Sequence, residues 1–107
     1  MDIATIHLYG KLRRFARESK AGHGNVIEVA PQPDETLEQL LARVGIPIDV
    51  IYNIFFNSKL LATRSPMAHW MGYQQVHANA LEWRLDIAVN AGDRIGIFGR
   101  DMAALVV

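Results

Sequence analysis

The sequence predicts an α+β domain in which a mixed β-sheet carries one main helix on one face. Three observations predict this class. Several short segments alternate apolar and polar residues with a period of two, as half-buried strands do. The segment from Thr36 to Gly45 has apolar residues at helical spacing and a boundary signal at each end. A Gly92-Asp93 turn precedes a last apolar strand near the end of the 107 residues.

The composition is that of an ordinary globular protein, which we expect to be a single domain over residues 1–107. Half of the residues are hydrophobic and 21% are charged. The 11 Lys and Arg balance the 11 Asp and Glu, so no global field favours nucleic acid or an anionic membrane. The absence of cysteine excludes disulfides and thiolate catalysis. No signal peptide or membrane-spanning run is evident, so we expect a cytoplasmic protein.

The first forty residues begin with a predicted hairpin. Residues 3–9 alternate, with Ala4, Ile6 and Leu8 on one side and Thr5, His7 and Tyr9 on the other, which indicates a strand. The turn-rich residues 21–25 lead into a second strand at 26–29. Pro31-Gln32-Pro33 prevents that strand from continuing, because proline cannot donate to a ladder.

A short helix is predicted over residues 11–19, with its apolar side chains facing inward. Its basic side chains then point outward and form a cluster. Such a cluster is typical of a solvated face, and it is also the composition of a docking patch for an acidic partner. The predicted docking patch consists of Lys11, Arg13, Arg14 and Arg17.

The clearest helix follows Thr36, which is a good N-cap and forms a capping-box pattern with Gln39. Gly45 is the expected C-terminal stop, with Pro47 just beyond it. Arg43 lies in the last turn, where a cation favours the helix dipole. The apolar stripe recurs at i, i+3, i+4 and i+7 and comprises Leu37, Leu40, Leu41 and Val44.

A second pair of strands is predicted after this helix. Residues 50–56 are apolar with little alternation, which indicates a strand covered on both faces. Asn57-Ser58 is a turn signal, and residues 59–61 begin a short return strand.

Residues 62–84 give no clear secondary-structure pattern and are predicted to be an insert. Residues 85–89 alternate and lead through the turn at 90–93 into the last strand.

Large apolar side chains gather in the insert and at the end of the sequence. Trp, Tyr and Met are enriched at the centres of interfaces. Burial of the three closing aliphatic side chains would contribute about 5 kcal/mol. The alternative is that the insert extends this domain's own core. The predicted interface consists of Trp70, Met71, Tyr73, Trp83, Leu105, Val106 and Val107.

Three stretches together carry a resemblance to a known family. They are residues 6–16, residues 35–47 and residues 90–98, with an additional short match at Ile54-Phe55-Phe56-Asn57. In order and spacing they resemble the MoaD/ThiS sulfur-carrier family of β-grasp (ubiquitin-like) proteins. The resemblance implies a β-grasp fold with the insert at about 62–84.

In that family the last strand runs into a Gly-Gly tail. An activating enzyme adenylates the terminal carboxylate, which becomes a thiocarboxylate and donates sulfur for molybdopterin or thiamine. This sequence has Val106-Val107 where the family has Gly-Gly, and β-branched residues are stiff and wide. We therefore expect a non-catalytic interaction module that is unable to carry sulfur. Near-zero net charge does little to keep copies apart, so a homodimer is expected.

Two other functions are consistent with the sequence. The first is a sulfur carrier activated at its C-terminus, which would work with a MoeB/ThiF-like activating enzyme or a molybdopterin synthase-like subunit. The second is a small RNA-binding β-grasp domain. We predict no catalytic, cofactor-binding or metal-ligating residue, because candidates such as His69 and His77 with Asp86 or Asp93 match no compact ligand motif.

Overall fold

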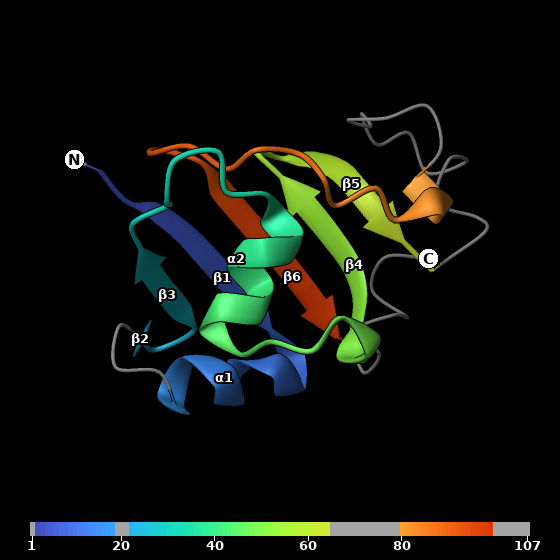
Figure 1. Ribbon diagram of the computed structural model, residues 1–107. Helices are drawn as coiled ribbons and strands as arrows, with labels where there is room; N and C mark the ends of the chain where they lie inside the picture. Colours follow the sequence, from blue (N-terminus) through green and yellow to red (C-terminus); the bar gives the residue numbers. More distant parts are fainter. Residues whose placement is uncertain (1, 19–21, 65–79, 100–107) are drawn as a thin grey trace.

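The computed structural model describes residues 2–18, 22–64 and 80–99, which form a mixed sheet with a helix across one face (Figure 1). The α+β class is therefore confirmed. The sheet has six strands in the order β2-β3-β1-β6-β4-β5. Their bounds are Ala4–Tyr9 for β1, Gly22–His23 for β2, Val26–Val29 for β3, Ile51–Phe56 for β4, Lys59–Thr63 for β5 and Arg94–Gly99 for β6.

The parallel strands β1 and β6 lie at the centre of the sheet. The predicted hairpin is confirmed, because β1 pairs antiparallel with β3 and places Ile6 opposite Ile27. On the other side β6 pairs antiparallel with β4, and β4 with β5. The short strand β2 was not predicted, since the sequence indicated only a turn over residues 21–25.

One face of the sheet carries the core. Alternate residues of the two central strands are fully buried, among them Ile6, Leu8, Ile95 and Ile97. Helix α2, Leu37–Val44, lies across this face (Figure 1) and buries the side chains of three leucines against it. The predicted helical stripe is confirmed at Leu37, Leu40 and Leu41.

Both ends of α2 follow the predicted boundary signals. The Gln39 amide N–H donates to the Thr36 hydroxyl at 3.2 Å, and the Gln39 side chain accepts from the Thr36 amide at 3.0 Å. Gly45 ends the helix in the left-handed region, at φ 83°. The capping box and the glycine stop therefore fix the length of α2.

The predicted N-terminal helix begins as a 3-10 turn, η1 at Gly10–Leu12, and continues as α1 at Arg13–Glu18. It lies at the lower end of the sheet in Figure 1. Leu12 and Ala16 are buried as predicted. Within residues 2–18, 22–64 and 80–99, no helix has the length and apolar character needed to cross a bilayer.

Residues 85–89 form no strand of the main sheet, although they alternate. Leu85 and Val89 are buried, and the backbone runs along the start of α2. The amide of Leu37 donates to the Ile87 carbonyl at 2.9 Å, and the amide of Glu38 donates to the Leu85 carbonyl at 3.1 Å. This segment therefore supplies acceptors for helix amides that have no partner inside the helix.

The turn at Asn57-Ser58 is confirmed, with φ values of 50° and 70°. The Asn57 side chain joins this turn to the predicted turn at 90–93. Its Nδ2 donates to Asp93 Oδ1 at 3.0 Å, and its Oδ1 accepts from the Arg94 amide at 2.8 Å.

The segments that flank the β4–β5 hairpin are also defined. A 3-10 turn, η2 at Ile48–Val50, leads into β4. Strand β5 extends to Thr63, so the predicted boundary of the insert at residue 62 was too early. A further 3-10 turn, η4 at Ala80–Glu82, packs beside β5.

Candidate interaction surface

Three aromatic rings lie together on the sheet face opposite α2. Tyr9 on β1 pairs in register with Phe98 on β6, and their rings stack with centroids 4.5 Å apart. Phe55 on β4 meets Phe98 edge-on at 5.7 Å. All three side chains are partly exposed, in contrast to the buried residues of the opposite face. We call these three residues the aromatic platform.

Gly96 lies between the rings of the aromatic platform. A Cβ atom at this position would meet side-chain atoms of Phe55, Tyr9 and Phe98 at 3.7 to 3.9 Å. Those separations are ordinary van der Waals contacts. A methyl group therefore fits, whereas a larger side chain would have to push the rings apart.

His7 lies on the same sheet face, in register with Gly96. Its Nε2 is 3.2 Å from the Thr5 hydroxyl oxygen. Burial lowers the pKa of the His7 imidazole, and the positive charge of Arg94 lowers it further. The neutral imidazole is therefore favoured beside the aromatic platform.

A buried polar pair joins β4 to β5. Asn53 is opposite Thr63, and the Thr63 hydroxyl donates to Asn53 Oδ1. Both residues are 2% exposed. The Asn53 Nδ2 group donates to no atom of the residues that the structure describes. The Nδ2 group of Asn53 is therefore a buried donor without an acceptor among these residues.

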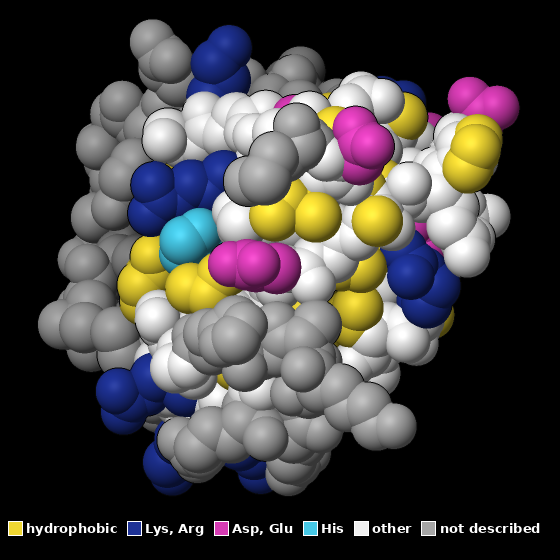
Figure 2. All heavy atoms as spheres, turned by 90° about the vertical axis from the view of Figure 1, so that its left-hand side faces the viewer, with side chains coloured by type: hydrophobic (Ala, Val, Ile, Leu, Met, Phe, Trp, Pro, Cys, Tyr) yellow, Lys and Arg dark blue, Asp and Glu magenta, His cyan; other side chains and the backbone are white. Residues whose placement is uncertain are grey.

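The predicted basic patch is exposed where it can be described. Lys11, Arg13 and Arg14 are exposed on η1 and α1, whereas the side chain of Arg17 lies outside the described residues. Figure 2 shows Lys and Arg side chains at the lower end of the molecule, where α1 lies in Figure 1, and others at its top and sides. Asp and Glu side chains lie higher on the same view. We call Lys11, Arg13 and Arg14 the basic cluster.

Of the predicted interface, only Trp83 lies within the described residues. Its ring packs against the core, and its Nε1 donates to the Thr63 carbonyl oxygen at 2.8 Å. The Arg64 guanidinium carbon lies 4.3 Å from the ring centroid. Trp83 therefore closes part of the β5 edge within its own domain. The other predicted interface residues, Trp70, Met71, Tyr73, Leu105, Val106 and Val107, lie outside the described residues.

Sequence reasoning missed the pairing of Glu35 with Arg43. Glu35 precedes the helix cap, and its side chain is 4% exposed. Its hydrogen bond with the Arg43 guanidinium lowers the pKa of Glu35 although burial opposes this shift. The two residues are eight positions apart, so the i, i+4 rule gives no signal for the pair.

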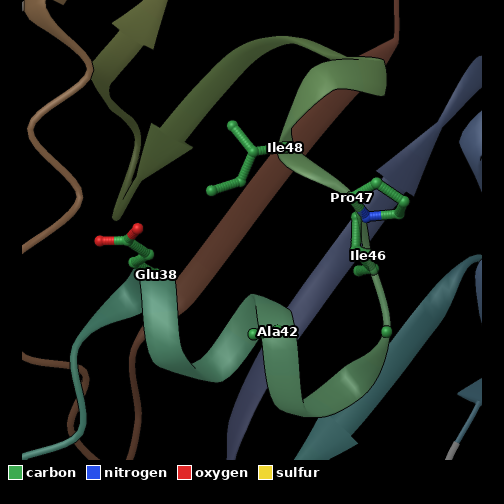
Figure 3. Close-up of a pocket in the computed structure, with 6 residues that line it drawn as sticks. Glu38, Ala42, Ile46, Pro47 and Ile48 are labelled. Carbon is green, nitrogen blue, oxygen red and sulfur yellow. The ribbon is translucent and has the colours of Figure 1, made fainter.

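A shallow pocket of about 430 Å³ lies along α2, from Glu38 near its start to the residues that follow its end (Figure 3). Its lining is mainly apolar, and Glu38 supplies the one carboxylate among the lining residues. The residues of α2 line one side, and the segment from Ile46 to Ile48 lines the other. Its volume suits a side chain or a small ligand. Within residues 2–18, 22–64 and 80–99, no three His, Asp or Glu side chains lie close enough to hold a metal ion.

Comparisons with protein families, with characterised proteins and with solved structures found no significant match to this chain.

Proposed function

We propose that this chain is a β-grasp domain of the MoaD/ThiS type that acts as a non-catalytic protein-interaction module. The strand order β3-β1-β6-β4-β5 is compatible with this fold, as are the parallel central pair and the helix across one face. The sequence resemblance over residues 6–16, 35–47 and 90–98 supports the same assignment.

The aromatic platform is the observation that carries the interaction role. Aromatic side chains on a sheet face that the main helix does not cover are only partly buried by this domain. Tyr and Phe bury a large area for a small loss of side-chain freedom, and aromatic residues are enriched at interfaces. The platform therefore has the composition of a contact surface.

The proposed partner is a second copy of the chain. With zero net charge there is little long-range repulsion between copies. A face-to-face contact of two platforms would be isologous and would close as a symmetric dimer. Such a contact would stack aromatic rings of both copies in a water-free centre.

Light scattering tests this role. The wild-type chain is expected to have twice the mass of a single chain, and Tyr9→Glu is expected to return it to the monomer mass. Tyr52→Glu, at a partly exposed tyrosine outside the platform, is the matched control and is expected to remain dimeric. A folded wild-type chain that stays monomeric would contradict the proposal. Circular dichroism checks that each variant is folded.

Intact-mass measurement separates this function from sulfur carriage. The chain would be incubated with a MoeB/ThiF-like activating enzyme, a sulfur donor and ATP. The interaction role predicts an unchanged mass. A mass gain equal to one exchange of sulfur for oxygen would identify the chain as a carrier and overturn the non-catalytic assignment.

A further inference from the structure

We infer that the basic cluster is a docking site for an acidic peptide segment of a partner protein. This inference goes beyond the dimer contact proposed above and adds a second partner at a separate surface. It concerns a different surface from the aromatic platform, although the two surfaces adjoin. The cluster follows β1 directly and lies at the end of the sheet where β1 and β6 finish.

The two arginines of the cluster differ from the arginines with structural contacts. Arg43 is paired with Glu35, and Arg64 donates to two backbone carbonyl oxygens while it lies on the ring of Trp83. No carboxylate of the described residues lies within ion-pair distance of Arg13 or Arg14. Both side chains are exposed, so a partner can reach them.

Both guanidinium groups are held in place before any partner binds. The Nε of Arg13 donates to the Gly10 carbonyl oxygen at 3.1 Å. The guanidinium carbon of Arg14 lies 4.9 Å from the centroid of the Phe15 ring. These contacts reduce the freedom that each side chain would lose on binding. The terminal N–H groups remain suited to the two oxygens of a carboxylate.

The rings of the aromatic platform take no part in this site. Tyr9 immediately precedes the cluster, and its ring is stacked on Phe98 at the same end of the sheet. In the proposed dimer these rings are covered by the second copy of the chain. The carboxylates of an acidic peptide would therefore contact the arginines and not the rings.

The basic cluster is too short to favour a nucleic acid as the ligand. Strong phosphate binding uses a long series of cations, whereas this cluster is short and the chain is neutral overall. The charge instead matches a few carboxylates on a peptide. An oligonucleotide is therefore included in the test as the competing outcome.

The test uses fluorescence anisotropy with a labelled peptide of glutamates. The full wild-type chain is expected to bind it more weakly as salt rises. Arg13→Glu with Arg14→Glu is expected to weaken binding by about tenfold or more. Lys59→Glu with Arg84→Glu makes the same charge change at two exposed sites outside the cluster and is expected to change affinity by less than about twofold.

Amide NMR on the wild-type chain covers the case in which a variant does not fold. Addition of the peptide is expected to shift the amides of residues 10–16. Shifts confined to other elements, or equal losses in both double variants, would overturn the inference. Tighter binding of a polyuridylate of similar length would also overturn it and would favour RNA. None of these outcomes alters the predicted dimer mass, so failure here is distinguishable from failure of the interaction role.

Discussion

Arg43 donates a hydrogen bond to each carboxylate oxygen of Glu35, one from its Nε and one from a terminal nitrogen, both at 2.8 Å. The same guanidinium also donates to the Ala30 carbonyl at 2.9 Å. Glu35 Oε1 in turn accepts from the Gln32 amide at 2.9 Å. The pair therefore ties the proline-containing loop after β3 to the last turn of α2, and so fixes where the helix lies on the sheet.

Breaking this pair is expected to destabilise the fold. Arg43→Met leaves a buried carboxylate without its cation and should cost about 2 kcal/mol of unfolding free energy. Arg84→Met, at an exposed arginine, should change stability by less than about 0.5 kcal/mol. Urea unfolding measures both. Equal stability of Arg43→Met and the wild type would show that the pair of Glu35 and Arg43 contributes nothing to the free energy of unfolding.

The same pair makes stability dependent on acid pH. The Arg43 guanidinium holds the pKa of Glu35 below its ordinary value of 4.5. The stabilisation is therefore fully present above pH 4.5 and is lost as the pH falls through the lowered pKa. Glu35→Gln should have a flatter stability profile in this acidic range. Unfolding midpoints of the wild type and the variant, measured across this acidic range, give the dependence of stability on pH. The same dependence in both proteins would show that other groups cause the loss of stability in acid.

His7 makes a second pH-dependent contribution. Because burial and Arg94 lower its pKa from 6.5, the unfolded chain binds this proton more readily than the folded chain does. Stability from this group is present above pH 6.5 and falls as the pH drops through the lowered value. Arg94→Gln should raise the pKa of His7 by removing the nearby charge. Imidazole chemical shifts followed by NMR measure this, and no change would leave burial as the sole cause.

Two glycines are expected to respond differently to alanine. Gly45 has φ 83°, and a methyl group added there would meet no heavy atom within 4 Å, so Gly45→Ala should cost about 1 kcal/mol through backbone strain alone. Gly96 lies in a strand, and a methyl group added there meets the platform at ordinary contact distance. Gly96→Ala should therefore be within about 0.5 kcal/mol of the wild type. Thermal unfolding gives the loss of stability in each variant. A larger loss in Gly96→Ala than in Gly45→Ala would contradict the strain argument.

The buried pair of Asn53 and Thr63 predicts a non-additive effect. Asn53→Val alone removes the Oδ1 acceptor of the Thr63 hydroxyl, and Thr63→Val alone removes the donor to Asn53 Oδ1, in a side chain whose Nδ2 already has no acceptor among the described residues. Each single change should lower the free energy of unfolding by about 1–3 kcal/mol. The double change removes the donor and the acceptor together, so it should cost less than the sum of the two single changes. A double-mutant cycle by urea unfolding measures the coupling. Simple additivity would show that the two side chains do not depend on each other.

Local sequence signals predicted the elements whose causes are local. The capping box at Thr36 and Gln39, the Gly45 stop and the alternation of β1 each depend on residues close in the chain. The extent of β5 was underestimated because Ala62 and Thr63 carry no distinctive strand pattern and are held by pairing with β4.

The candidate site was harder to predict because it depends on topology. Tyr9 and Phe98 stack only because β1 and β6 pair in parallel, and the sequence separation between them gives no local signal. Alternation does place each of them on the outward side of its strand. The basic cluster was predicted from sequence because its residues lie within one short segment.

The interaction role is tested most directly by isotope-filtered NMR on a mixture of labelled and unlabelled chains. We predict intermolecular contacts from the rings of Tyr9 and Phe98, and their loss in Tyr9→Glu. An absence of intermolecular contacts at these rings under conditions where the chain is folded and concentrated would contradict the role assigned to the aromatic platform.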